Sequence, residues 1–177
     1  MIPDLLGLGT IQRVLQNLLR ENVSIRDMNT ILETMADIAQ YTKMPDILTE
    51  HVREALSRNI SRQYQTDDGT IPVMTLDQAI ENTIAQSIQE TGQGSYLGID
   101  PVSGEAIITA IENSLETFSM FNYQPLVLCS PVVRPHLKRL TERAVSNLVV
   151  LSHNEISPDV RIESLGFISL DELAEAG

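Results

Sequence analysis

The residues best suited to do chemistry are a thiol and two hydroxyls that follow apolar runs. Cys129 and Ser130 follow Leu126–Leu128, and Ser152 follows Leu148–Leu151. If both runs are parallel strands, these side chains meet at the edge where α/β proteins bind ligands, so a nucleophile there is chemically reasonable. Against this, the chain has no G-x-S-x-G elbow, and apolar neighbours disfavour the reactive thiolate. We therefore predict a core cysteine, with a small α/β enzyme or nucleotide-binding domain near Cys129 and Ser130 as the alternative.

A glycine-rich segment, GQGSYLG at residues 92–98, invites a dinucleotide-binding interpretation. Its spacing is G-x-G-x-x-x-G instead of G-x-G-x-x-G, and it follows a predicted helix where the fingerprint follows a strand. We interpret it as a connection that ends the helix. No cofactor is predicted.

The three histidines, His51, His136 and His153, lie far apart in the sequence. His51 and Glu54 form H-x-x-E on one helix face, which is not the two-histidine zinc pattern. A metal site would need long-range convergence that no local pattern indicates. We predict no metal site and no catalytic residue.

Composition excludes several classes of partner. The chain has 177 residues with 24 acidic and 12 basic side chains, a formal net charge of −12. Such a balance repels nucleic acid and anionic membrane surfaces. The single cysteine, Cys129, rules out a disulfide within one chain and fits a reducing compartment. The sequence has no apolar run long enough for a membrane span and no basic, apolar N-terminus typical of a signal peptide.

The first third of the chain predicts a helical subdomain, residues 1–69. A first helix carries one apolar stripe at helical spacing, formed by Ile11, Val14, Leu15, Leu18 and Leu19. A second helix is predicted to open at Ser24, with Asp27 in its first turn as a shortened capping box. Pro45 suits the start of a third helix.

The remainder predicts a small α/β subdomain, residues 70–169, followed by an acidic tail, residues 170–177. Strands are expected at residues 71–76, 126–129, 148–151 and 161–168, with Pro72 placing the first at an edge or strand start. Asp77, Asp100 with Pro101, and Arg134 mark the starts of three helices. The strand, helix, strand order of the last third is a βαβ-like unit. The predicted fold class is therefore α+β or α/β, with a mixed sheet.

Several ordered blocks of the sequence resemble one family. They are VLQNLLRE, VSIRD and TILETMAD, then KMPDILTEHVREALSRNISRQY, PVMTLD, QPLVLCSPVVRPHLKRL and VVLSHNEISPDVRIESLG. In this order they resemble the C-terminal part of the cytoplasmic domain in the FlhA family of type III secretion export gates. The resemblance covers nearly the whole chain, and the segment SIRDMNTILE resembles flagellar members more than injectisome members. Met1 stands where the family has an interior apolar residue, so we expect a fragment with an added start codon.

The resemblance implies an interaction module and no enzyme. Family members form a cytoplasmic ring, usually of nine subunits, at the inner membrane, and pass export substrates and their chaperones to a membrane channel. The helical part then corresponds to a ring-contact subdomain, while chaperones bind mainly to subdomains outside this chain. Other export-apparatus proteins are further expected partners. As subunit-interface positions we predict the charged residues around the turn between the first two helices: Arg20, Glu21, Arg26 and Asp27.

Overall fold

The computed structural model describes residues 6–170, and the chain forms two compact units. The first unit runs to Gln63 and also includes Asn154–Ser157, while the second comprises Tyr64–His153 and the segment from Pro158 onward. The division predicted after residue 69 stays a prediction. The predicted acidic tail lies outside the described residues, apart from Leu170.

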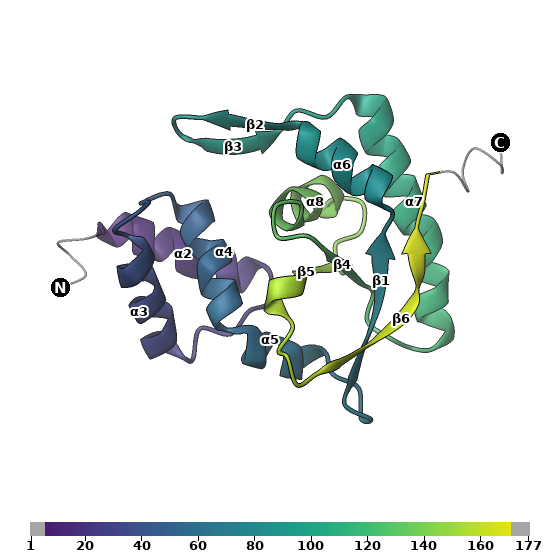
Figure 1. Ribbon diagram of the computed structural model, residues 1–177, viewed down its shortest axis with the longest axis horizontal. Coiled ribbons are helices and arrows are strands. Elements are labelled where there is room, and N and C mark those ends of the chain that lie inside the picture. Colours follow the sequence, from purple (N-terminus) through teal and green to yellow (C-terminus); the bar gives the residue numbers. More distant parts are fainter. Residues whose placement is uncertain (1–5, 171–177) are drawn as a thin grey trace. The chain divides into compact units, whose positions relative to one another are not determined.

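The first unit is helical (Figure 1). Its elements are α2 (Leu8–Arg20), α3 (Met28–Ile38), α4 (Pro45–Ala55) and α5 (Ser57–Tyr64). Helices α2 and α3 both pack against α4. The core consists of aliphatic and methionine side chains at helical spacing, all at most 2% exposed: Val14, Leu18, Ile31, Met35, Leu48, Val52, Leu56 and Ile60.

Two expectations for the first unit were wrong. Helix α3 begins at Met28, because Asp27 is its N-cap: the Asp27 carboxylate accepts a 3.3 Å hydrogen bond from the Thr30 N–H and a 2.7 Å bond from the Thr30 hydroxyl. The Ser24 hydroxyl instead accepts a bond from the Arg26 N–H in the preceding loop. Leu19 is not in the core, since 52% of it is exposed.

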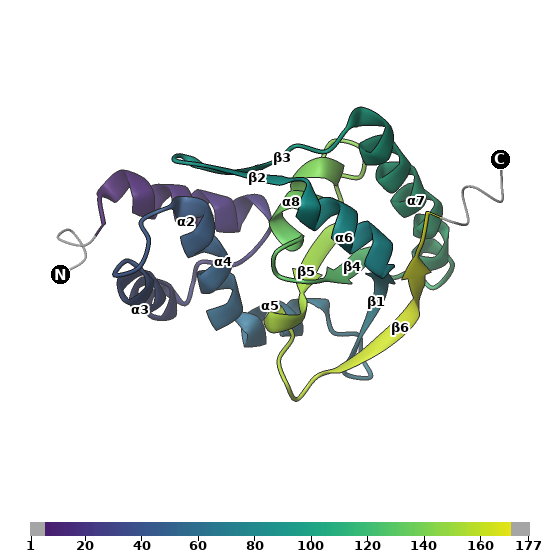
Figure 2. The ribbon, with the colours of Figure 1, turned by 45° about the horizontal axis from the view of Figure 1, so that its top comes forward.

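The second unit contains a four-stranded parallel sheet and a separate antiparallel hairpin. The strand order in the sheet is β5 (Val149–Ser152), β4 (Leu126–Cys129), β1 (Thr70–Leu76) and β6 (Arg161–Ile168). The hairpin joins β2 (Ile88–Thr91) to β3 (Gly94–Leu97), and Figure 2 shows it as a narrow ribbon. The predicted α+β class is confirmed, with the parallel and antiparallel pairings in different sheets.

Three helices cover one face of the parallel sheet. Helices α6 (Gln78–Gln86), α7 (Pro101–Met120) and α8 (Arg134–Thr141) share one hydrophobic core with the strand residues that point toward them. These strand residues alternate along each strand, as a pleated sheet requires: Met74, Leu76, Val127, Cys129 and Val150. The strand predicted to be buried on both faces, β4, is buried at all four positions.

Pro72 was predicted to lie in an edge strand or at the start of a strand. This prediction was wrong, since β1 is not an edge strand and begins at Thr70. Strand β1 is central, but its pairing with β4 covers only Met74 and Thr75, whereas its pairing with β6 extends over the whole strand. Pro72 therefore lies beyond the end of the β4 ladder, where the missing N–H breaks no hydrogen bond to that strand. In this way a proline fits into a central strand.

Candidate protein-interaction site

The carboxyl edge of the parallel sheet is occupied by the chain's own side chains. There the Ser130 N–H donates a 2.7 Å hydrogen bond to Oε1 of Glu81, a half-buried residue of α6. The Asp77 N–H donates to the Ile168 carbonyl at 2.8 Å, and the Ser169 hydroxyl to the Asp77 carboxylate at 3.4 Å. Two carboxylates at this edge repel an anionic ligand such as a nucleotide phosphate.

The candidate nucleophiles of the rival hypothesis are brought near this edge but are enclosed. Cys129 and Ser152 are paired across β4 and β5, and their exposed fractions are 1% and 2%. Ser130 is half-buried, and its backbone is held by Glu81. A buried thiol without access to solvent packs as a small apolar side chain. The geometry therefore favours the core-cysteine interpretation.

The glycine-rich segment, residues 92–98, lies in the β2–β3 hairpin and contains its tight turn. Thr91 pairs with Gly94, so Gly92 and Gln93 form the two-residue turn. Gly94 has φ +135°, a backbone conformation that residues with a Cβ rarely adopt. The glycines at residues 92 and 94 thus serve the turn, and they lead directly into strand β3 instead of a helix N-terminus at which a phosphate could bind.

The histidines do not converge. His51 is exposed on α4, His153 is exposed after β5, and His136 is buried in α8 with its Nε2 3.5 Å from the Ser95 hydroxyl. In residues 6–170, no three side chains of the metal-binding types are grouped so that they could hold an ion. Within the same range, no helix is both long and apolar enough to cross a lipid bilayer.

The four charged residues selected from the sequence have different roles in the structure. Arg20 and Arg26 are exposed. The Glu21 side chain is 12% exposed, with a carboxylate oxygen 3.8 Å from Nη1 of Arg53. Asp27 is exposed and caps α3. Since Glu21 and Asp27 also serve the fold, Arg20 and Arg26 are the two positions whose charge is fully available at the surface.

An apolar margin on α2 is a surface feature that the sequence interpretation missed. Leu8 is 83% exposed and Leu19 is 52% exposed, and half-buried Leu15 lies between them in the sequence. The three residues follow one another at i, i+7 and i+11, along one side of the buried stripe of Val14 and Leu18. The sequence signal for it was partial, because Leu15 and Leu19 lie at one side of the predicted apolar stripe. We name Leu8, Leu15 and Leu19 the α2 margin.

Comparisons with known proteins connect this chain to export-apparatus proteins. The FHIPEP family model matches residues 1–161. The chain is 38% identical over 168 residues to the flagellar biosynthesis protein FlhA of Bacillus subtilis, an alignment covering 95% of this chain and 25% of that protein. It is 31% identical over 169 residues to the low calcium response locus protein D of Yersinia pestis, covering 96% of this chain and 24% of that protein. The chain thus spans about a quarter of the length of these curated relatives.

Solved structures share the fold over nearly the whole chain. The CdsV protein of Chlamydia pneumoniae matches with a TM-score of 0.87 and 34% identity, covering 94% of this chain and 48% of that one. A structure described as nonameric EPEC SctV-C matches with a TM-score of 0.84 and 34% identity, covering 94% and 50%. A third match, with a TM-score of 0.82 and 32% identity, covers 94% and 49%; it comes from a complex of CdsV and CdsO.

Proposed function

Since the chain belongs to the FHIPEP family, we propose that it is part of a type III secretion export gate and acts there by binding proteins. The observation that carries this proposal is its match, over 94% of its length, to a subunit of a nonameric assembly. In this function the chain contributes to ring assembly and to the transfer of export substrates and chaperones to a membrane channel. The site of action is the cytoplasmic face of the inner membrane.

The proposed partners follow from the relatives. A second copy of the chain is the first partner, because a structural relative is nonameric. Other export-apparatus proteins are the second, because a relative was solved in complex with CdsO. As the family resemblance implies, we expect substrates and chaperones to bind mainly outside this chain. The rival enzyme near Cys129 and Ser130 receives no support, because the thiol is enclosed and carboxylates line that edge.

The surface that we propose for contact between copies lies on the helical part, within residues 1–69. The α2 margin offers apolar area, and the positively charged Arg20 and Arg26 lie beside it in the sequence, at the end of α2 and in the following loop. An apolar centre with a polar rim is the usual composition of a protein interface. Glu21 and Asp27 complete the charged cluster in this proposal, although both also have partners within the chain.

The first prediction concerns Leu19→Asp, which places a charge on the α2 margin. Because a buried unpaired charge is costly, we expect the dissociation constant for self-association to rise at least about tenfold. Sedimentation velocity over a range of concentrations measures this. The matched control is Val102→Asp on α7, where an equally apolar residue is 80% exposed. Equal weakening by both variants contradicts the proposed surface, and a wild-type chain that stays monomeric at all concentrations contradicts its self-association.

A further inference from the structure

The connection between β5 and β6 contributes a short segment to the helical unit. Asn154–Ser157, here called the strap, belongs to the first compact unit, while β5 and β6 on either side of it belong to the second. Two of its four residues, Glu155 and Ser157, are almost completely buried, at 1% and 3% exposed. The strap is therefore an integral part of the helical unit, although it lies about a hundred residues further along the chain.

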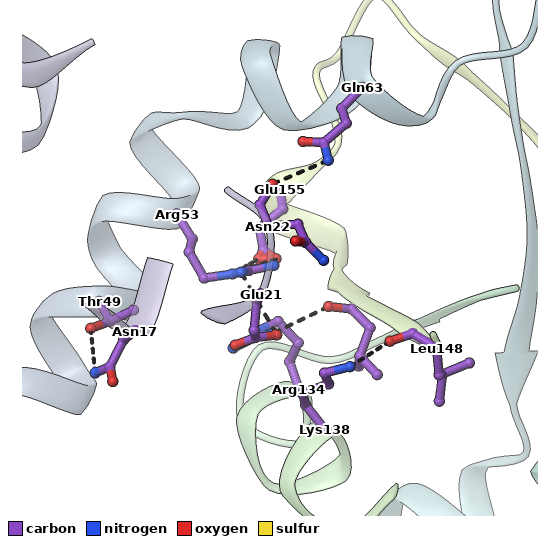
Figure 3. Close-up of polar contacts among 11 residues, drawn as sticks. Asn17, Glu21, Asn22, Thr49, Arg53, Gln63, Arg134, Lys138, Leu148 and Glu155 are labelled. Carbon is purple, nitrogen blue, oxygen red and sulfur yellow. Dashed lines mark hydrogen bonds and ion pairs between the residues drawn. The ribbon is translucent and has the colours of Figure 1, made fainter. Parts of the chain in front are cut away.

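A buried ion pair holds the centre of the strap (Figure 3). Nε of Arg53 donates to Oε2 of Glu155 at 3.0 Å, and Nη2 donates to Oε1 at 3.0 Å, a bidentate arrangement. Arg53 is 2% exposed and lies on α4. Its third nitrogen, Nη1, is 3.8 Å from Glu21 and makes no hydrogen bond in the described part of the chain. Glu155 is thus the principal counterion of this guanidinium.

The other anchors of the strap are also polar. The Ser61 hydroxyl of α5 donates to the Glu155 carbonyl at 3.2 Å and accepts from the Ser157 N–H at 2.9 Å. The Asn154 amide donates to the Glu54 carboxylate at 3.2 Å in an exposed contact. Apolar burial adds little, since Ile156, the one aliphatic residue of the strap, is only half-buried. Hydrogen bonds and the Arg53–Glu155 ion pair therefore hold the strap. Loss of either partner removes such a contact.

We propose that the Arg53–Glu155 pair is a latch that closes the strap onto α4 and α5 and can open without unfolding the parallel sheet. Without the Glu155 charge, the buried Arg53 guanidinium keeps only Glu21, 3.8 Å away, as a counterion, which is costly at a buried site. Opening of the strap lowers this cost because water then reaches the guanidinium. Three residues separate the strap from β6 along the chain. The latch is a property of the single chain and does not depend on the proposed ring.

The second prediction tests the latch by hydrogen exchange on the full chain. In Glu155→Gln, which keeps the shape but removes the charge, amides of the strap and of α4 and α5 should exchange at least about a hundredfold faster than in the wild type. Amides of β1 and β4 should stay within about tenfold of wild type. Mass spectrometry of peptic peptides resolves these regions.

Two further variants make the test decisive. The matched control Glu54→Gln alters the exposed hydrogen bond to the same strap and should leave exchange within about threefold, since substitutions at exposed contacts change stability little. The double variant Arg53→Met with Glu155→Leu removes both charges and should bring α4 and α5 back to within about tenfold of wild type, because an apolar pair of similar volume replaces a buried ion pair at small cost. The latch is refuted if Glu155→Gln loses protection equally in β1 and β4, fails to fold, or shows no local change. It is equally refuted if the double variant exchanges as fast as Glu155→Gln.

Discussion

At the scale of single residues, carboxylates satisfy donors that would otherwise be left unpaired. Glu81 accepts the Ser130 N–H, Asp27 and Asp100 each accept the N–H of the third residue of α3 and α7, and Glu155 neutralises buried Arg53. Each of these bonds has an ionised acceptor, which makes it stronger than a bond between neutral groups. Part of the negative charge of the chain is therefore structural.

The third prediction concerns Glu81→Ala. It removes the acceptor of the Ser130 N–H at the carboxyl edge of β4, so the free energy of unfolding should fall by about 1.5–3 kcal/mol, the usual contribution of a hydrogen bond to a charged group. Urea denaturation monitored by circular dichroism measures this. Glu90→Ala, at an exposed position of β2, is the control and should change stability by at most about 0.5 kcal/mol. Equal decreases in the free energy of unfolding in both variants would show that the Glu81–Ser130 hydrogen bond makes no specific contribution.

At the scale of elements, the helix starts are determined by local capping chemistry. Pro45 and Pro101 begin α4 and α7 as the sequence predicts, and Asp100 caps α7 by accepting a 2.9 Å bond from the Ser103 N–H. The hydroxyl of Ser103 and then its N–H hold the pKa of the Asp100 carboxyl below its ordinary value of 3.8. Because the folded-state pKa is lowered, this stabilisation is fully present above the ordinary value and is lost as pH falls through the folded-state pKa.

The fourth prediction follows from the lowered pKa of Asp100. In the wild type, amide protection in the first turn of α7 should decrease as pH is lowered from about 5 to about 2.5, because the folded-state pKa of Asp100 lies below the ordinary value of 3.8. Hydrogen exchange of residues 102–105, corrected for the intrinsic pH dependence of exchange, measures this. Asp100→Asn keeps an uncharged cap and should show no such decrease. A decrease of the same size in Asp100→Asn would assign the effect to other groups.

At the scale of the whole molecule, a net charge of −12 opposes association between copies of the chain. An assembly built from such chains needs apolar contacts, or contacts between unlike charges, that outweigh this repulsion. The α2 margin and the positive charges of Arg20 and Arg26 are among the exposed features of the helical unit that could supply them. The resemblance to the export-gate family, drawn from ordered blocks, is confirmed by the family match and by the shared fold.

The fifth prediction uses the dependence of that repulsion on salt. Raising sodium chloride from about 50 mM to about 500 mM shortens the screening length from roughly 14 Å to roughly 4 Å, so self-association of the chain should strengthen severalfold. Sedimentation velocity at the two salt concentrations measures the change. Weaker association at high salt would contradict this and would indicate that ion pairs involving Arg20 and Arg26 dominate the contact.

The sequence alone was sufficient for features that depend on neighbours within a few residues. The caps and prolines marked the starts of α4 and α7, the apolar run predicted β4 as a strand buried on both faces, and the ordered blocks indicated the family. These signals are local because backbone hydrogen bonding and side-chain periodicity act over one or two turns of helix or strand. The N-cap of α3 shows the limit of such signals, since the helix was predicted to open at Ser24 and is capped instead by Asp27.

Only the tertiary structure decided which faces are covered and which distant charges meet. Leu19 and Val14 have similar side chains on the same helix, yet one is half exposed and the other is fully buried, because packing against α4 determines the covered side. The central position of β1 likewise depends on which strands lie beside it. Arg53 and Glu155 are 102 residues apart, and no local pattern relates them. Their pairing depends on burial, which removes water as the alternative partner of each charge and exists only once the chain has folded.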